Sequence, residues 1–419
     1  MTDAVFDHHS EDYARNWRDI NRDLREKCPV AHTTAHGGYW VVSKYADIAD
    51  VARDDETFSS YQPNGDGSHK GVTIPSTVLR HLPIEMDPPE FFDYRRLLNE
   101  RFSPAAVKSW EPYQRAITTF CIDQVIESGS CDLVGDLTAP VPTILTLELL
   151  GLQKDNWKQI SDVAHAVMHT VAGSTQNDAA HAGMFEVMEQ CAEVMTLRRA
   201  APTDDLISLL VHAKIKGELL TDERIMQMIT LIVLGGVDTT GSLISNVIEW
   251  LYRNPVERAR LREDPSLLRP ATEEFLRYFS PVPGLARVTT KQCTVGDQEI
   301  GPGERLFLAW SSANYDESIF ERPDEVQIER SPNRHHTFGL GIHRCIGSNF
   351  ARAEFRIVME ELLRRIPDYK IDESARPYTS IGIVNGWVSL PATFTPGSRE
   401  GSGETPMTLA GPRAIAKKA

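Results

Sequence analysis

The sequence has few cysteines and fewer basic than acidic residues. Its 419 residues include six cysteines, and none of them forms a C-x-x-C pair. This count excludes a disulfide-stabilised scaffold and argues against a zinc ribbon or a thioredoxin-type motif. With 44 Lys+Arg against 59 Asp+Glu the net charge is -15, so no nucleic-acid partner is predicted. The first ten residues lack the basic start and apolar segment of a secretory signal. We therefore expect a cytoplasmic protein.

No apolar run is long enough to predict a membrane span. Between Arg224 and Glu249 the only charged residue is Asp238, and the uncharged run before it covers only 225–237. A span requires ~18–20 apolar residues. A threonine N-cap followed by two acids begins the segment, and an Asn-Pro pair ends it, which predicts one helix over 222–253. At 1.5 Å per residue it is roughly 48 Å long, so it should be buried and cross one large domain.

Helical periodicity dominates the rest of the chain. Apolar residues recur at helical spacing over 107–128, 157–172, 182–199, 268–279 and 350–366. Strands are predicted at 38–42, in a small meander over 294–295, 299–300 and 305–310, and in a hairpin over 381–394. The fold class is therefore mainly α with a small β region. We divide the chain into an N-terminal segment (1–27), one large domain (28–396) and a flexible, Gly/Ser/Pro-rich C-terminal tail (397–419).

One cysteine, Cys345, has unusual surroundings. It lies in the glycine-rich stretch FGLGIHRCIG, which ends where the last long helix begins. Glycines permit tight turns and the close approach of a flat ligand. A helix N-terminus and the neighbouring Arg344 both favour a thiolate, and a thiolate is a good ligand for a soft metal. From these features alone, a metal ligand and a buried structural cysteine are equally supported.

The spacing Phe338-x-x-Gly341-x-x-x-Cys345-x-Gly347 resembles the heme-binding loop of the cytochrome P450 family, in its bacterial form. The resemblance covers nearly the whole chain and implies the P450 fold, a single large domain that encloses heme b (iron protoporphyrin IX). It also implies that Cys345 is the axial ligand of the heme iron, whose thiolate favours O–O cleavage. Phe338, Gly341 and Gly347 would shape the heme-binding loop.

A second motif is Glu274-x-x-Arg277, whose two side chains share one helix face. Such a pair occurs on many helix surfaces. The resemblance instead implies a buried pair that braces the cysteine loop, with Arg330 of FERPDEVQIER as the third partner.

A third motif, Gly235-Gly236-Val237-Asp238-Thr239, lies in the middle of the long helix. Each mid-helix glycine costs about 1 kcal/mol against alanine, and a lone carboxylate in an apolar stretch is costly unless it is used or paired. A solvent-facing kink would explain both. The resemblance implies that Gly235 lets the helix pass close over heme, and that Asp238 relays protons while Thr239 hydrogen-bonds the oxygen being activated.

The resemblance also places the groups that bind the heme propionates. Arg287, His343 and Arg95 match family positions with this role. The position four residues before Arg95 is commonly a hydrogen-bond donor, but here it is Phe91, so propionate binding on that side depends on fewer partners. His165 and His169, at i and i+4, could share a metal, but we interpret them as pocket or surface residues.

The resemblance implies a monooxygenase that inserts one atom of O2 into its substrate, and the aliphatic pocket residues predict an apolar substrate such as a terpenoid, fatty acyl chain, steroid or macrolide. No flavin domain is evident, so a ferredoxin and a ferredoxin reductase would supply electrons near Arg344 and Arg95. A peroxide-driven peroxygenase and a non-catalytic heme sensor are the alternatives, which the Asp238–Thr239 pair disfavours. The predicted substrate pocket, closed by 72–79, consists of Leu231, Leu234, Val282, Pro283, Leu285, Ile383 and Val384.

Overall fold

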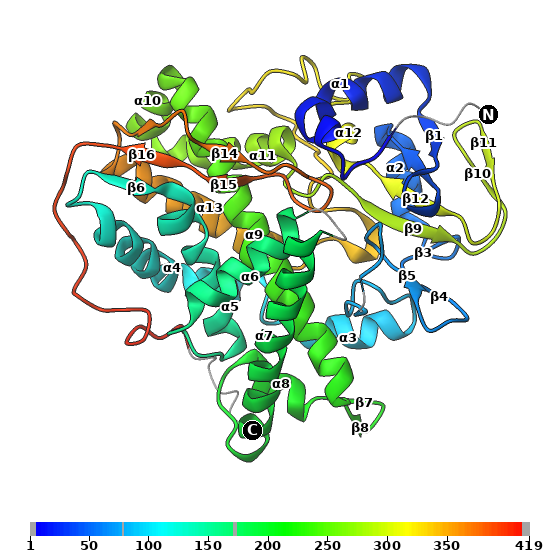
Figure 1. Cartoon of the computed structure of the whole chain (residues 1–419), viewed down its shortest axis with the longest axis horizontal. Coiled ribbons are helices and arrows are strands. Elements are labelled where there is room, and N and C mark those ends of the chain that lie inside the picture. The colour runs from blue at the N-terminus through cyan, green and yellow to red at the C-terminus, as the bar shows by residue number, and fades with distance from the viewer. Residues whose placement is uncertain (1–5, 78, 171–173, 413–419) are drawn as a thin grey trace.

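The computed structural model describes residues 6–77, 79–170 and 174–412. Helices make up most of the molecule, and the largest sheet lies on the side that carries the N-terminal region (Figure 1). The predicted fold class, mainly α with a small β region in one domain, is confirmed.

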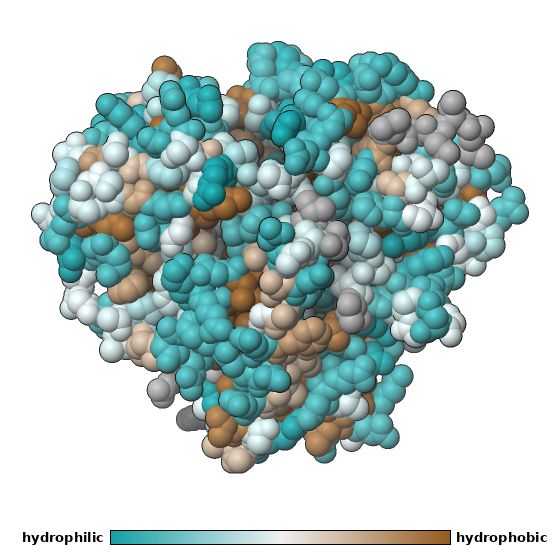
Figure 2. Space-filling view, in the orientation of Figure 1, coloured by the Kyte–Doolittle hydropathy of each residue, from teal (hydrophilic) through white to brown (hydrophobic). Residues whose placement is uncertain are grey.

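The central element is α9 (Asp222–Arg253), which has the predicted limits. The Thr221 side chain accepts a hydrogen bond from the backbone N–H of Arg224, and the helix ends at Asn254, before a proline. Within the described part of the chain, α9 alone is long and apolar enough to cross a membrane, but 67% of its most apolar window is buried. The face of the molecule in Figure 2 is mainly hydrophilic. The burial of the apolar window of α9 is typical of a helix in a protein core.

Further helices surround α9 and carry the site. Predicted and observed limits agree for α11 and lie within a turn for α4, α6 and α13, although residues 171 and 172 of the predicted α6 range lie outside the described residues. Helix α7 begins at Thr175, well before the predicted residue 182, because Ser174 caps a polar first turn that apolar spacing does not reveal. The helices are α1 (Glu11–Lys27), α2 (Tyr45–Arg53), α3 (Glu90–Asn99), α4 (Pro104–Val125), α5 (Pro140–Leu150), α6 (Trp157–His169), α7 (Thr175–Ala200), α8 (Leu206–His212), α10 (Pro255–Glu263), α11 (Leu268–Phe279), α12 (Trp310–Ala313) and α13 (Ser348–Arg365), with short turns η1 (Ala35–Gly37), η2 (Val134–Thr138), η3 (Pro265–Leu267) and η4 (Gly341–His343).

The largest sheet joins three strands from the first 60 residues to two strands from residues 285–308. Its strand order is β1 (Val30–Thr33), β2 (Tyr39–Val42), β12 (Arg305–Leu308), β9 (Leu285–Thr289) and β3 (Phe58–Ser59). The predicted single meander is wrong, because β10 (Cys293–Val295) pairs only with β11 (Gln298–Ile300), while β12 lies parallel to β2 and antiparallel to β9. The physical reason is burial: three consecutive apolar residues of β12 are buried, as suits an interior strand.

The predicted hairpin over 381–394 is also wrong. Strand β15 (Trp387–Ser389) pairs with β14 (Arg376–Pro377), whereas β16 (Pro391–Thr393) lies between β13 (Lys370–Ile371) and β6 (Ser130–Asp132). Only Leu390 separates β15 from β16, which is too short for a hairpin turn. Two more short pairs are β4 (Gln62–Pro63) with β5 (His69–Lys70), and β7 (Lys214–Ile215) with β8 (Glu218–Leu219).

Both terminal segments pack on the domain. Helix α1 buries Tyr13 and Trp17 in an apolar cluster with Phe307 of β12, so the predicted boundary at residue 28 separates elements that pack together. The segment after β16 follows the outer side of α4 (Figure 1), where Asp123 accepts a hydrogen bond from Gly401 N at 2.7 Å. As far as residue 412 the structure therefore differs from the predicted free tail, because helix carboxylates satisfy its backbone N–H groups.

We expect stability to depend on the protonation of Glu354 in α13. This carboxyl is 3% exposed, and its Oε1 has no hydrogen-bond partner among the described residues. Burial raises the pKa of Glu354 from 4.5 to about 8, so between these values the folded protein holds a proton that the unfolded chain has released. The free energy of unfolding should therefore fall as pH rises across this window, at up to ~1.4 kcal/mol per pH unit.

The measurement is denaturant unfolding at about pH 6 and about pH 8 for the wild type and Glu354→Gln. The glutamine keeps the shape without the charge, so the variant should lose less stability between the two pH values. Equal losses in both proteins would contradict the role assigned to Glu354.

Candidate functional site

The cysteine loop is closed by its own backbone. The N–H of Cys345 donates to the carbonyl of Phe338 at 2.8 Å, and Gly339 and Gly341 have φ values of +67° and +66°, which favour glycine. A Cβ on Gly341 would overlap the backbone carbonyl of Ala52 in α2. The loop can therefore reach its place against α2 only with glycine at position 341.

The Cys345 thiol is accessible within its loop, although protein atoms surround it. Burial raises the pKa of Cys345, and the backbone N–H of Gly347 and the guanidinium groups of Arg95, Arg344 and Arg352 act against that rise. The ring of Phe338 lies under the Arg352 guanidinium, 4.5 Å from its centroid. Several positive groups thus converge on one sulfur atom, an arrangement that stabilises negative charge there.

The glycines of α9 serve different purposes. Gly235 is accessible although α9 is the central helix, and a Cβ added there would meet nothing within 4 Å. A Cβ on Gly236 would lie 2.6 Å from Thr146 Oγ1 of α5, and one on Gly241 would overlap the Thr138 carbonyl. Gly236 and Gly241 therefore permit close packing, whereas Gly235 keeps one face of α9 open.

The side chains of Asp238 and Thr239 point to different partners. The Thr239 hydroxyl donates to the carbonyl of Gly235 at 2.8 Å. Asp238 is 5% exposed, and its Oδ1 lies 2.8 Å from His165 Nδ1 of α6. Tyr378 Oη donates to both Asp238 oxygens at 3.1 and 3.2 Å. Sequence reasoning missed His165 and Tyr378 as Asp238 partners, because 73 and 140 residues separate them from Asp238.

Three basic side chains lie near the cysteine loop. Arg287 of β9 is 4% exposed, and burial lowers its pKa to about 10, which the charge of Asp87 partly offsets. His343 is kept neutral, because burial and the charges of Arg287 and Arg95 hold its pKa well below 6.5. Within the described ranges neither Arg287 nor Arg95 has a carboxylate hydrogen-bond partner, and His343 Nδ1 has no hydrogen-bond partner.

Phe91 of α3 compensates in part for the missing donor. Its ring packs edge-on against His343, with 4.5 Å between the ring centroids, while His343 Nε2 lies 3.0 Å from Ser60 Oγ. These contacts fix the imidazole, so Phe91 orients a donor instead of providing one. Arg95 is anchored separately, by a 2.7 Å hydrogen bond from its Nη2 to the carbonyl of Arg344.

The Glu274–Arg277 pair is fully buried on α11, not a surface pair. Arg277 donates to both carboxylate oxygens of Glu274 at 2.8 Å, and both side chains are 0% exposed. Arg330 Nε also donates to Glu274, at 3.0 and 3.1 Å. The remaining N–H groups of Arg277 donate to the carbonyls of Asn314, Pro323 and Glu325. A buried charge pair is stable only when satisfied in this way.

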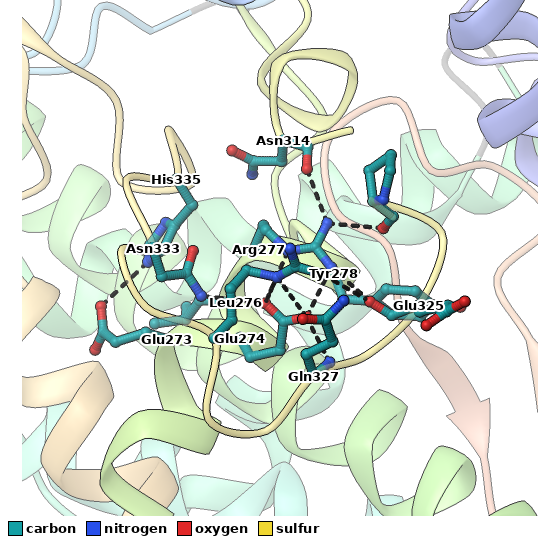
Figure 3. Close-up of polar contacts among 12 residues, drawn as sticks. Glu273, Glu274, Leu276, Arg277, Tyr278, Asn314, Glu325, Gln327, Asn333 and His335 are labelled. Atoms are coloured by element: carbon teal, nitrogen blue, oxygen red, sulfur yellow. Dashed lines mark hydrogen bonds and ion pairs between the residues drawn. The ribbon is translucent and has the colours of Figure 1, made fainter. Parts of the chain in front are cut away.

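The buried pair is linked to the cysteine loop through Asn314. Its carbonyl accepts from Arg277, its Nδ2 donates to Thr337 Oγ1 at 2.9 Å, and its Oδ1 accepts from His336 N at 2.6 Å. Thr337 immediately precedes Phe338. His335 pairs with Glu273 at 3.2 Å (Figure 3). The strand-like segment before the loop is thus held in place by α11.

A cavity of about 180 Å³ lies between the segment 72–77, α6, α7 and β9. Leu285 and Ile383 are among its lining residues, together with polar residues such as His8, His9 and His181. Residue 78 of the predicted 72–79 segment lies outside the described residues.

The other predicted pocket residues do not line this cavity. Leu231, Leu234 and Val282 are half-buried, and Leu234 packs against two apolar clusters. Pro283 and Val384 are buried and are not among the residues that line this cavity. Val384 instead packs with Phe6 in the cluster under α1. A short apolar pair in sequence does not reveal which of its residues points into the core.

The donor set fits a heme. One thiolate is a suitable axial ligand, and the buried guanidinium of Arg287 and the unpartnered Nδ1 of His343 are suitable partners for two propionates. The space beside Gly235 is open, which would allow a flat group to approach that face of α9. In the part of the chain that the structure describes, no three His, Cys, Asp or Glu side chains could together hold a metal ion, and a heme iron needs only one protein ligand.

Comparisons with known proteins agree with this chemistry. The family model for cytochrome P450 matches residues 112–367. A steroid C26-monooxygenase of Mycobacterium tuberculosis is 33% identical over 91% of this chain and 95% of its own length. A linalool 8-monooxygenase of Pseudomonas putida is 31% identical over 90% of this chain and 95% of its own length. A Bacillus megaterium P450 solved in complex with testosterone is 28% identical, with a TM-score of 0.81 over 92% of this chain and 99% of its own. The chain therefore belongs to the cytochrome P450 family of heme-thiolate monooxygenases.

Proposed function

We propose that this protein is a bacterial, cytoplasmic P450 that oxidises an apolar steroid or other terpenoid with electrons from a ferredoxin and its reductase. The observation that carries the proposal is the accessible Cys345 thiol in a loop that is closed by its own backbone and surrounded by arginines. Cys345 would be the iron ligand, with Phe338, Gly341 and Gly347 shaping the loop.

When bound, heme supplies the activation of O2 for insertion of one oxygen atom into a C–H bond or an alkene. The chain's own residues have separable tasks in this reaction. Arg287, His343 and Arg95 bind and orient the propionates, while Gly235 leaves one face of α9 open. Thr239 offers a hydroxyl to the oxygen being reduced, and Asp238 supplies the protons. The lining contributed by Leu285 and Ile383 excludes water from the substrate.

The apolar part of the cavity lining supports an apolar substrate. Relatives named for steroid and linalool oxidation favour steroids and other terpenoids among the apolar substrates. We expect apolar steroids and terpenoids to shift the ferric heme spectrum of the purified holoenzyme toward high spin as they displace water. The measurement is a spectral titration of a ligand panel that includes testosterone, linalool, fatty acids and macrolides. A panel in which only charged polar molecules cause the shift would overturn the substrate class.

The electron donor is inferred from charge. The chain carries a net charge of -15, yet Arg95 and Arg344 lie together at the cysteine loop, joined by the Arg95–Arg344 carbonyl hydrogen bond. An acidic ferredoxin is attracted to such a local basic surface. This docking would place the donor on the Cys345 side, opposite α9.

Thr239→Ala is expected to uncouple electron use from product formation. The variant loses the only hydroxyl that this position offers, so protons reach the oxygen less selectively and NADH is consumed without product. General acid–base groups typically contribute 100-fold or more, and we expect product per NADH to fall by about tenfold while NADH consumption continues. Thr239→Ser, which keeps the hydroxyl, is the matched control. Unchanged coupling in Thr239→Ala would contradict the proton role.

A further inference from the structure

Asp238 lies between titratable side chains that come from two other parts of the chain. His165 Nδ1 of α6 is 2.8 Å from Asp238 Oδ1, and Tyr378 Oη bonds to both carboxylate oxygens. Tyr378 Oη also lies 2.9 Å from His165 Nδ1, so the three groups form a closed cluster. Asp238 is 5% exposed, whereas 16% of the His165 side chain is exposed. One hydrogen bond therefore joins a buried carboxylate to an imidazole that reaches solvent.

A small cavity adjoins the same cluster. Asp238, His165 and Tyr378 line it together with Ser242 and Ser245, and its volume is about 10 Å³, close to the space that one water molecule requires. The Ser242 hydroxyl also donates to Asp238 Oδ2, at 3.4 Å. The polar lining lies on the side of α9 where Asp238 points, not on the side where Thr239 contacts Gly235.

We propose that His165 reloads Asp238 with protons from solvent, and that Tyr378 holds the carboxylate in line for this transfer. The inference rests on the proton role proposed above for Asp238. In each transfer the Nδ1–H bond of His165 breaks and an O–H bond forms on Asp238 Oδ1. The neutral ring then takes up a proton from hydronium in the solvent, which leaves water and restores the imidazolium, and no electron moves. His165 acts through Asp238 and is therefore a positioning residue.

The charges around His165 make it suitable for this task. Burial acts to lower the pKa of His165. The charge of Asp238 and the hydrogen bond between the two side chains outweigh this effect and raise the pKa above 6.5. Burial lowers the pKa of His169, and burial and the Asp238 charge hold the pKa of Tyr378 well above 10. Glu186 of α7 faces Gln159 at the other end of α6. The titratable groups that face His165 are Asp132, Asp162, His169, Asp238 and Tyr378.

The first test is the pH dependence of coupling in the holoenzyme with a surrogate ferredoxin and reductase. In the wild type, product per NADH should fall as pH rises through the pKa of His165, because the imidazolium is depleted. In His165→Asn, product per NADH should be lower by about tenfold at neutral pH and should not depend on pH. This loss is smaller than the ~100-fold typical of a lost general acid, because water replaces the imidazole.

His169→Asn is the matched control. His169 lies one helical turn from His165 and bonds to the His165 carbonyl at 2.6 Å, not to Asp238. The control should keep the wild-type pH profile. If His169→Asn shows the same change as His165→Asn, the effect comes from a disturbed end of α6, and the inference is overturned.

The second test does not depend on turnover. The Cε1–H resonance of His165, identified by its loss in His165→Asn, is titrated in the diamagnetic, reduced, CO-bound holoenzyme. Its midpoint should lie above 6.5 in the wild type and fall in Asp238→Asn, and an unchanged midpoint would overturn the inference. If Asp238→Asn stays fully coupled, the proposed role of Asp238 fails. If Asp238→Asn uncouples while His165→Asn keeps the wild-type pH profile, only the His165 inference fails.

Discussion

Replacing Cys345 by alanine is expected to abolish both monooxygenase activity and the spectral signature of thiolate ligation. The variant removes the one sulfur in the loop, while Arg287, His343 and Arg95 remain to bind propionates. Heme is therefore expected to bind more weakly and without its axial thiolate. The measurement is the absorbance of the reduced, CO-bound protein, whose Soret band should lose the red-shifted position typical of thiolate ligation.

The other cysteines provide the control for this result. Cys28 is also exposed, but it is the C-cap of α1, and its thiol donates to the carbonyl of Val30 at 3.6 Å. Cys28→Ala should keep the red-shifted band and full activity. A Cys345→Ala protein that retained the band would contradict the ligand assignment, whatever its activity.

Removing either member of the Glu274–Arg277 pair is expected to prevent formation of the holoenzyme. Both side chains are 0% exposed, and breaking a buried pair costs ~3–5 kcal/mol because a charge is left uncompensated. The native state of a domain is stable by only about 5–15 kcal/mol. Loss of Glu274 also releases Arg330, and loss of Arg277 frees the carbonyl of Asn314, which holds the segment leading into the cysteine loop.

We expect Glu274→Ala and Arg277→Ala to yield little soluble protein, and any soluble fraction to have a low heme content per chain. Arg277→Lys keeps the charge but not the two-pronged geometry, and it should give an intermediate melting temperature. The matched control is Arg15→Ala in the exposed Glu11–Arg15 pair of α1, for which the expected change is within about 1 kcal/mol. Normal heme content in Glu274→Ala would contradict the bracing role.

Features with a local cause could be predicted from the sequence. The limits of α9 and α11 follow from a capping residue, an apolar period and a stop signal, all within a few residues. The spacing around Cys345 likewise identifies the loop. Strand pairing is different, because β12 finds its neighbours at Trp40 and Arg287, and neither partner is visible from residues 305–308. The predicted meander was wrong for this reason.

The same distinction applies to the site. Asp238 was recognisable as a lone carboxylate in an apolar helix, but its partners His165 and Tyr378 come from remote parts of the chain. Phe91 could be seen to lack a donor, whereas its contact with the His343 ring required the approach of α3 to the cysteine loop. The different positions of the adjacent Ile383 and Val384 could not be predicted, because they depend on burial in the folded protein. Ile383 lines a cavity, whereas Val384 packs in the core.

The pairing of β2 with β12 has a consequence for how the chain is made. Trp40 lies opposite Leu306, so the first strands to leave the ribosome must wait for more than half of the polypeptide before their sheet can close. The cysteine loop, near residue 345, emerges later still, after the apolar α9. Contacts of such long sequence separation fold slowly and leave apolar surface exposed meanwhile. Chaperones and a ready supply of heme should therefore matter most at the end of synthesis, and slow translation alone should not raise the yield of active protein.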